Sequence, residues 1–415
     1  MSDHSGNALV LGAGIVGVST ALWLQRLGMQ VTIMDREGFA AGTSYGNAGV
    51  LASAAVVPVT VPGLWKKAPS MLLNSNEPLF LKWSYLPRLL PFLLRYMSNA
   101  NARDTRRIGE GLATLMYDAY EQHLVLAKGT PAEKFLRSGD YIYAYDSKQM
   151  FEKDAFSWNQ RRDLGFEDEE LNADDLSVYD PQLAGRFSYA VRCPEHGQIT
   201  DPGAYVSALG QTFIDNGGEL VIAEAIDILL ENGKAKAAVT NKGTVEADQI
   251  VLSTGAWSGP LSAKLGRKVP LESERGYHVE FVNSNIQLRS CTMVASKKFA
   301  VNSMDGRLRC AGIVEFGGLN KGPSQGPIEL LKRNAHEIFP ELEYDSVNVW
   351  MGHRPSTSDS LPLIGNYESV PNVWAGFGHQ HLGLTGGPKT GRWLAQLITG
   401  ETPNVDMKPY SPNRF

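Results

Sequence analysis

Near its start the chain carries three closely spaced glycines between two apolar runs, and this pattern constrains the fold more than any other feature. A short apolar strand leads into Gly12, Gly14 and Gly17, a helix follows, and a second apolar strand ends in Asp35. In such a unit the first glycine makes a tight turn, the second admits a pyrophosphate, and the third lets the helix pack on the strand. An acid about 20 residues after the motif can bind ribose hydroxyls. We therefore predict a dinucleotide site on a βαβ unit rather than a purely structural turn.

Length, charge and cysteine content narrow the class of protein. A chain of 415 residues exceeds what one hydrophobic core usually serves, so two domains are expected. The formal net charge of −5 gives no electrostatic reason to expect a nucleic-acid partner. Cys193, Cys291 and Cys310 share no metal-like spacing, so no metal site is predicted, and the sparse cysteines favour a reducing compartment. Residues Met1–Asn7 lack the parts of a secretion signal, so a cytoplasmic location is expected.

One apolar and aromatic segment, residues 78–97, raises the question of membrane contact. Lys82, Arg88 and Arg95 interrupt it, as do two prolines, so its uncharged runs fall short of the ~20 residues that a membrane span requires. The segment can lie on a bilayer with its tryptophan and tyrosines at the interface. Packing on the body of the protein is the favoured interpretation, and peripheral contact with the inner face of the cell membrane is the alternative.

The rest of the chain alternates between nucleotide-fold pieces and β-rich pieces. The patterns predict a helix over 100–128, strands around 135–145 and 187–192, a helix over 201–214 and a hairpin turning at 231–234. They further predict a buried strand that runs into a glycine turn within 249–257, long β segments over 269–314, a helix over 327–338, and a last helix that Pro388 opens and Gly400 ends. This alternation predicts two interleaved domains rather than two consecutive ones.

Five further motifs stand in a fixed order along the chain. They are Gly42–Gly49 (GTSYGNAG), Ile250–Trp257, Arg275-Gly276-Tyr277, Gly352–Pro355 (GHRP) and Gly383–Gly387 (GLTGG). With them the chain resembles, from Ala8 to Phe415, the D-amino-acid oxidase-like superfamily of FAD-dependent amine oxidoreductases. It looks most like the bacterial D-amino-acid dehydrogenases, and glycine and sarcosine oxidases are more distant.

The resemblance implies an α/β fold, α+β overall, with an FAD-binding Rossmann-like domain interleaved with a mixed β-sheet substrate domain. The FAD-binding domain is expected to comprise 1–95, 195–265 and 350–415, and the substrate domain 96–194 and 266–349. The glycine-rich stretch after Asp35 independently favours a bulky cofactor over a simple nicotinamide. FAD is expected to be non-covalent, because the position at which some relatives link flavin to a histidine reads Gly46.

The implied reaction is FAD-dependent oxidative deamination of a small amino acid, a D-amino acid by resemblance. A hydride passes from Cα to flavin N5, the imine hydrolyses to a 2-oxo acid and ammonia, and electrons pass to a quinone or another carrier. The cofactor carries the difficult step, so the protein supplies position and electrostatics. The expected cofactor-binding residues are Gly12, Gly14, Ile15, Val16, Gly17, Asp35, Arg36, Thr43, Ser44, Asn47, Ala48, Gly49, Ala225, Ile226, Thr254, Gly255, Trp257, Gly352, Arg354, Gly378, His379, Leu382, Gly383, Leu384 and Thr385.

Four residues are expected to meet the substrate. The guanidinium of Arg354 is expected to bind the substrate carboxylate by two hydrogen bonds, and the Tyr277 hydroxyl is expected to donate a further one. His278 is expected to line the substrate pocket, and the Tyr45 ring is expected to face the substrate. Thr43 and Ser44 are expected to bond to phosphate. The amino end of the helix after Pro388 is expected to stabilise negative charge on the reduced flavin.

Several alternatives stay open at this stage. An oxidase or dehydrogenase of glycine, sarcosine or an imino acid such as hydroxyproline fits the same motifs. A flavin electron-transfer subunit needs no carboxylate clamp, and a NAD-linked dehydrogenase would have no visible absorption. The sequence does not specify the side chain or chirality of the substrate, the electron acceptor, or the oligomeric state.

Overall fold

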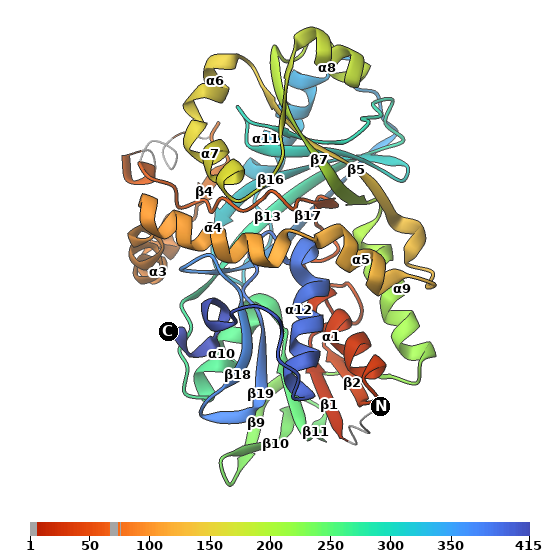
Figure 1. The fold of residues 1–415 in the computed structure, drawn as a ribbon, viewed down its shortest axis with the longest axis vertical. Coiled ribbons are helices and arrows are strands. Elements are labelled where there is room, and N and C mark those ends of the chain that lie inside the picture. The colour runs from red at the N-terminus through yellow and green to blue at the C-terminus, as the bar shows by residue number, and fades with distance from the viewer. Residues whose placement is uncertain (1–5, 67–73, 75) are drawn as a thin grey trace.

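The structure is a computed structural model that describes residues 6–66, 74 and 76–415. The start of the segment weighed as a secretion signal therefore lies outside the described residues. Figure 1 shows two layers of β-structure, with a nucleotide-type sheet in the lower half of the view and a larger sheet in the upper half. The mixed α/β fold predicted from the sequence is confirmed.

The six-stranded sheet is mostly parallel and holds the predicted βαβ unit at its centre. Its strands, in spatial order, are β18 (Leu363–Tyr367), β19 (Val370–Phe377), β12 (Gln249–Leu252), β1 (Asn7–Leu11), β2 (Gln30–Asp35) and β8 (Glu219–Ile222). The central strand β1 pairs with β2 and with β12, and Ala8 lies opposite Gln249. Four of the six strands therefore come from beyond the middle of the chain.

Helices and a small sheet surround this core. The helices are α1 (Ile15–Arg26), α9 (Pro202–Asp215), α10 (Ser258–Lys264) and α12 (Gly383–Ile398), and the small sheet holds β9 (Ala225–Glu231), β10 (Lys234–Thr240) and β11 (Gly243–Glu246). The predicted hairpin between β9 and β10 is confirmed: Asn232 and Gly233 both have positive φ, as its two-residue turn requires. Helix α12 packs along α1 in Figure 1, and Gly391 permits this because a Cβ there would lie 2.6 Å from the Ser19 carbonyl carbon.

The larger sheet is mixed and presents two different faces. Its strands, in spatial order, are β17 (Ser346–Thr357), β13 (Leu271–Val282), β16 (Arg307–Phe316), β15 (Phe299–Met304), β14 (Cys291–Val294), β5 (Leu136–Tyr145), β7 (Tyr189–Ile199) and β3 (Val50–Leu51), with β4 (Leu79–Leu81) on β16 and β6 (Glu169–Asn172) on β7. One face packs on α11 (Gln325–Ile338), through Leu331 among others. The other face turns towards the nucleotide-type sheet.

These pairings bear on the predicted interleaving. The expected segments do alternate between the two large sheets, but β3 and β4 lie within the expected segment 1–95 and pair in the larger sheet. The expected boundaries at residues 195 and 350 fall inside β7 and β17. The division into two domains stays a prediction. If domains were assigned by the sheet to which each strand belongs, the boundaries would differ from those expected.

The remaining helices are α3 (Leu86–Ser98), α4 (Ala102–Met116), α5 (Ala119–Ala127), α6 (Lys148–Lys153), α7 (Ala155–Asp163) and α8 (Ala173–Tyr179), and single turns of 3₁₀ helix lie at Trp83–Tyr85, Glu133–Phe135, Pro181–Leu183, Gly255–Trp257, Lys408–Tyr410 and Pro412–Arg414. Of these helices, α3, α4 and α5 cross the middle of the molecule between the two sheets, whereas α6, α7 and α8 lie by the larger sheet (Figure 1). The single helix predicted over 100–128 is wrong, because the chain breaks between α4 and α5. Lys389 of α12 donates to the Thr114 carbonyl (2.7 Å) and the Asp118 carboxylate (2.6 Å) at this break.

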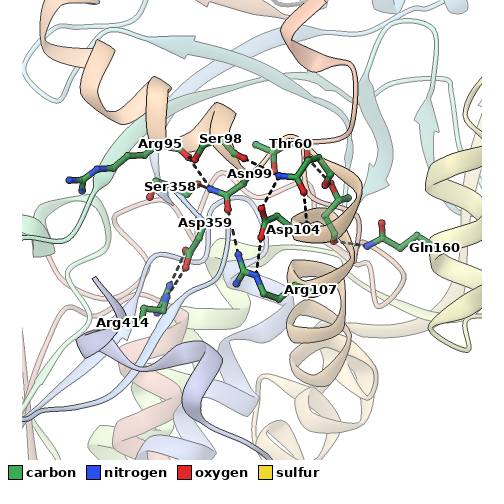
Figure 2. Close-up of polar contacts among 12 residues, drawn as sticks. Thr60, Arg95, Ser98, Asn99, Asp104, Arg107, Gln160, Ser358, Asp359 and Arg414 are labelled. Carbon is green, nitrogen blue, oxygen red and sulfur yellow. Dashed lines mark hydrogen bonds and ion pairs between the residues drawn. The ribbon is translucent and has the colours of Figure 1, made fainter.

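A polar network fixes the junction of α3 and α4 against the segment that follows β17 (Figure 2). The Asn99 amide donates to the Ser358 carbonyl over 3.0 Å. Arg414, near the end of the chain, forms a two-pronged ion pair with Asp359, with N–O distances of 2.7 and 3.0 Å. Both side chains of this pair are mostly buried. The network therefore holds the end of β17, the strand that carries Arg354.

Candidate cofactor and substrate site

A cavity of about 1480 Å³ lies between the carboxyl ends of the parallel strands and one face of the larger sheet. On the side of the six-stranded sheet it is lined by Gly12 after β1, Asp35 at the end of β2 and Thr254 after β12. This is where open α/β sheets bind ligands, because the loops after parallel strands meet at one edge. The volume exceeds the 300–1,000 Å³ typical of small-ligand pockets, so a large cofactor and a substrate can share it.

The glycine motif forms the turn that the sequence predicts. Gly12 has a φ of +109°, and a Cβ there would lie 2.4 Å from the Ser253 carbonyl oxygen. A Cβ at Gly17 would lie 1.9 Å from the Gly12 carbonyl oxygen, so Gly17 serves the packing of helix on strand and does not line the cavity. No side chain caps α1 at Gly14, and its first turn faces the cavity. A helix amino end with free N–H groups attracts phosphate.

Asp35 and its neighbours form the end of the cavity expected to hold an adenosine. The Asp35 carboxylate accepts the Ala13 N–H at 2.9 Å on one oxygen and the Glu37 N–H at 2.8 Å on the other. The oxygen that accepts from Glu37 also accepts the Gly38 N–H at 3.0 Å. The other oxygen, Oδ2, accepts one N–H and retains a lone pair for a ribose hydroxyl. The Arg36 guanidinium lies 3.9 Å from the centre of the Trp257 ring, and both residues line the cavity.

The loop Gly42–Gly49 runs along the cavity, but its hydroxyls differ in what they can offer. Ser44 Oγ accepts the Ile15 N–H at 3.0 Å, which leaves its proton for an acceptor in the cavity. Thr43 Oγ1 donates instead to the His353 carbonyl at 2.9 Å, so its expected donation to phosphate is not available in this arrangement. Asn47 accepts the Gly49 N–H at 2.8 Å, which shapes the turn. Gly49 itself does not line the cavity.

Helix α12 begins at Gly383, and the prediction that Pro388 opens it is wrong. Proline has no N–H, so the carbonyl of Leu384, four residues earlier, lacks its partner within the helix. His123 Nε2 donates to this carbonyl at 2.9 Å, and its Nδ1 accepts the Tyr205 hydroxyl at 2.8 Å. Burial lowers the pKa of His123 to about 4, so the ring is neutral at pH 7. The sequence analysis missed His123, for which only the proline is a signal.

The first turn of α12 also faces the cavity. Leu382, Gly383, Leu384 and Thr385 line it, as predicted. No side chain caps this end, and no acidic residue lies in its first turn. Its free N–H groups are therefore available to a ligand that gains negative charge.

Arg354 on β17 faces the cavity without a direct ion-pair partner among the described residues. Its guanidinium lies over Gly276, where a Cβ would be 2.6 Å from Arg354 Cζ. Within the described residues it forms no ion pair and no side-chain hydrogen bond. Burial lowers the pKa of Arg354, and Glu274 opposes that shift. A desolvated guanidinium with its fork free is suited to a ligand carboxylate.

Tyr277, His278 and Tyr45 do not reach the cavity, contrary to the sequence prediction. Successive residues of a strand point to opposite faces, and Tyr277 points to the face under α11, where its hydroxyl donates to Glu315 at 2.7 Å. His278 points to the other face but is covered by Trp350, on which its ring stacks at 5.2 Å. Tyr45 is 44% exposed at the outer side of its loop.

Three further predicted cofactor residues also lie off the cavity. Ile226 is 52% exposed on the small sheet. Gly352 lies against Trp350, since a Cβ there would be 2.0 Å from its Cη2 atom. Gly378 has a φ of +92° and serves a turn. The predicted residues that line the cavity are Gly12, Gly14, Ile15, Val16, Asp35, Arg36, Thr43, Ser44, Asn47, Ala48, Ala225, Thr254, Gly255, Trp257, Arg354, His379, Leu382, Gly383, Leu384 and Thr385.

Further polar residues complete the lining of the site. Gln380 lines the cavity, and its Nε2 is buried without a hydrogen-bond partner. His381 lines the cavity, where desolvation by burial and then the positive charge of Arg354 lower its pKa to about 4, so its ring is neutral at pH 7. Glu274 is 6% exposed and lines the cavity on the strand beside Arg354. A ligand with polar groups along its length, as FAD is, fits these free donors together with the two helix ends.

The cavity has an apolar continuation towards the surface at α3. Leu89 and Leu93 line it, and so do Trp83, Leu90 and Leu94, which are 56, 48 and 55% exposed. Among the helices of the described residues, none is long and apolar enough to cross a bilayer. No cluster of three or more potential metal ligands lies in the described part of the chain.

Comparisons with known proteins agree with this geometry. The sequence profile of the family described as FAD dependent oxidoreductase matches residues 7–397. A relative from Bradyrhizobium diazoefficiens named D-amino-acid oxidase is 38% identical over 413 residues, which cover 98% of each chain. A relative from Rhizobium rhizogenes named D-amino acid dehydrogenase is 26% identical over 423 residues, covering 98% of this chain and 99% of the relative.

Solved structures share the fold. Glycine oxidase from Geobacillus kaustophilus matches with a TM-score of 0.76 and 21% identity, covering 99% of both chains. L-Proline dehydrogenase from P. horikoshii matches with a TM-score of 0.75 and 18% identity, covering 99% of this chain and 98% of the other.

Proposed function

Because the chain belongs to the family of FAD-dependent oxidoreductases, we propose that it oxidises a small D-amino acid to its 2-oxo acid and ammonia. The observation that carries this proposal is Arg354, a desolvated guanidinium that faces the cavity and forms no ion pair within 4 Å among the described residues. Both relatives described above are named for D-amino acids, which supports this chirality. FAD bound in the cavity supplies the acceptor for a hydride from the carbon that bears the amine.

The residues of the chain have separable roles in this proposal. The amino end of α1, Ser44 and Asp35 hold the phosphates and a ribose of FAD. The guanidinium of Arg354 holds the substrate carboxylate by two parallel hydrogen bonds and so fixes which carbon faces the acceptor. The free N–H groups at Gly383–Thr385 stabilise negative charge that gathers nearby during reduction. No side chain needs to form a covalent bond.

An anaerobic screen tests the proposal. The FAD-loaded protein is mixed with single D- and L-amino acids, glycine, sarcosine and hydroxyproline, one at a time. Bleaching of the flavin absorbance band at about 450 nm is followed. We expect bleaching by D-amino acids and not by their L-enantiomers. If none of these compounds bleaches the flavin, the proposal is overturned. Bleaching by glycine, sarcosine or hydroxyproline alone would instead favour an oxidase or dehydrogenase of glycine or an imino acid.

We further propose that electrons leave through an apolar carrier such as a quinone. The support is the apolar continuation of the cavity, which reaches the exposed residues Trp83, Leu90 and Leu94. Helix α3, which carries Leu90 and Leu94, is amphipathic and therefore also suits peripheral contact with a membrane. The relative at 38% identity is named an oxidase, so transfer to oxygen is the second candidate. Parallel assays of quinone reduction without oxygen and of peroxide formation in air separate the two.

The proposal also includes non-covalent FAD, since the loop carries Gly46 at the position where some relatives carry the linking histidine. Acid precipitation tests this directly. We expect the yellow colour to stay in the supernatant, and colour in the pellet would contradict the proposal.

A further inference from the structure

A buried carboxylate stands beside the Arg354 guanidinium and has no assigned role. Glu274 on β13 lies in register with Arg354 on β17, so their side chains leave the same face of the sheet. Both line the cavity, and the Glu274 side chain is 6% exposed. The two groups nevertheless form no ion pair within 4 Å, because the Arg354 guanidinium lies over Gly276. A separate cation and anion therefore face the same space.

The surroundings of Glu274 leave its carboxylate without a full set of partners. Among the described residues its side chain has no hydrogen bond of 3.5 Å or less, and the nearby Ser356 hydroxyl is buried without a partner. Burial raises the pKa of Glu274, the positive charge of Arg354 opposes that shift, and the negative charge of Glu272 adds to it. From the facing helix α3, Tyr96 is the nearest titratable group, and burial raises its pKa further from neutrality.

The charges match those of a free amino acid. An amino acid at neutral pH carries a carboxylate and an ammonium on one carbon, and a guanidinium beside a carboxylate complements both. We propose, on the basis of the function proposed above, that Glu274 binds the ammonium of the substrate and takes one of its protons before oxidation. Glu274 is then a catalytic residue, whereas a role only as the distant counter-ion of Arg354 would make it a positioning residue.

The chemistry balances with the groups that the proposed function names. An N–H bond of the ammonium breaks, and its proton goes to a carboxylate oxygen of Glu274. The freed electron pair on nitrogen forms the C=N bond as the Cα–H bond breaks and its hydrogen leaves with two electrons to FAD, the oxidant. Water then hydrolyses the iminium to the 2-oxo acid and ammonium. A carboxylate with a raised pKa is a stronger base for the first step than a free one.

The test uses the FAD-loaded full chain and the amino acid that bleaches the flavin fastest in the screen described above. Glu274→Gln keeps the shape and removes the base. Glu272→Gln is the matched control, because Glu272 lies two residues away, is 9% exposed and has a raised pKa, but bonds to the Tyr85 hydroxyl and does not line the cavity. Anaerobic rates of flavin bleaching are measured from pH 6 to pH 10.

We expect Glu274→Gln to slow bleaching at pH 7 by about 100-fold or more, the usual effect of removing a general base. Its rate should then rise about tenfold per pH unit towards the pKa of the substrate's own amine, because only the neutral amine reacts. Glu272→Gln should not show this tenfold rise per pH unit, because the Glu274 base remains. Glu274→Asp, which retains a carboxylate, should recover part of the rate and restore the wild-type pH dependence.

A binding measurement separates the proton role from a positioning role. Propionate, which has a carboxylate and no amine, is titrated against the flavin absorbance. We expect Glu274→Gln to bind propionate as well as the wild type or more tightly, since a negative charge has been removed. Loss of propionate binding, or a wild-type pH profile in Glu274→Gln, would overturn the proposal for Glu274 and leave the proposed function intact. If no amino acid bleaches the wild type, both proposals fall.

Discussion

Replacing Arg354 by methionine should separate ligand binding from stability. Methionine fills a similar volume without charge, so the variant loses both hydrogen bonds of the guanidinium fork. Hydrogen bonds to charged groups contribute about 1.5–3 kcal/mol each, so two are worth about 3 kcal/mol at the lower bound. This corresponds to a Kd for propionate that is about 100-fold higher. Arg354→Lys keeps the charge and loses the fork, so its Kd should lie between those of wild type and Arg354→Met.

The same variant should not lose thermal stability. The Arg354 guanidinium has no counter-ion within 4 Å among the described residues, and burial lowers its pKa, so its removal relieves a desolvation cost. We expect the Tm of the FAD-loaded protein to stay unchanged or rise. Arg392→Met, on the exposed side of α12, is the matched control and should change neither quantity. A propionate Kd for Arg354→Met within threefold of wild type would refute the reasoning.

Three further predictions concern neighbouring groups. Arg275 is fully buried and paired with Glu315 at 2.9 Å, so Arg275→Met should cost about 3–5 kcal/mol and lower the Tm by about 1 °C per kcal/mol in a chain of this length, as calorimetry would show. Tyr277→Phe should leave kcat/KM within about twofold of wild type, because its hydroxyl bonds to Glu315 away from the cavity, and a large rise in KM would contradict this placement. His123 has a pKa lowered to about 4 by burial, so the unfolded chain binds a proton that the folded chain does not between about pH 6.5 and 4. The free energy of unfolding should therefore fall with decreasing pH in that window, and His123→Asn should reduce this slope by about 1.4 kcal/mol per pH unit in urea titrations at several pH values.

The nucleotide-binding unit could be predicted from sequence because its signals are local. The glycine motif, the flanking apolar strands and the terminal Asp35 lie within 30 residues or so of one another, and each has one dominant physical reason. The hairpin at Asn232-Gly233 belongs to the same class, since two residues with positive φ specify the turn.

The start of α12 could not be predicted, because the deciding interactions are tertiary. Glycines weaken an isolated helix, so the GLTGG segment favours a loop followed by a helix that begins at Pro388. In the folded protein Gly387 permits close contact with Ile15, where a Cβ would be 2.9 Å from Cγ1, and His123 satisfies the carbonyl that Pro388 leaves free. The break between α4 and α5 has a similar origin, since Lys389 binds the carbonyl of Thr114 from outside the helix.

The substrate side of the site was predicted less completely, and the reason lies in the geometry of a strand. The Arg-Gly-Tyr motif drew attention to Tyr277, but the side chains of a strand alternate, and nothing local shows which set faces the cavity. The same strand offers Glu274 to the cavity, and no single-sequence pattern marks it. Arg354 could be selected because it lies within the Gly352–Pro355 motif. That its guanidinium forms no ion pair could not be predicted, because this depends on Gly276, over which the guanidinium lies.

The strand order of the six-stranded sheet has a consequence for how the protein must be made. On the ribosome, β1 and β2 emerge first, but β12, which completes the other side of β1, follows more than 200 residues later, and β19 and α12 come near the end of synthesis. Until β12 is made, the nascent chain exposes an unpaired edge of the apolar strand β1, and such an edge promotes aggregation unless a chaperone covers it. Such long-range pairing also slows folding. A translation arrest before β12 would leave the Gly12 turn without the Ser253 carbonyl against which it packs.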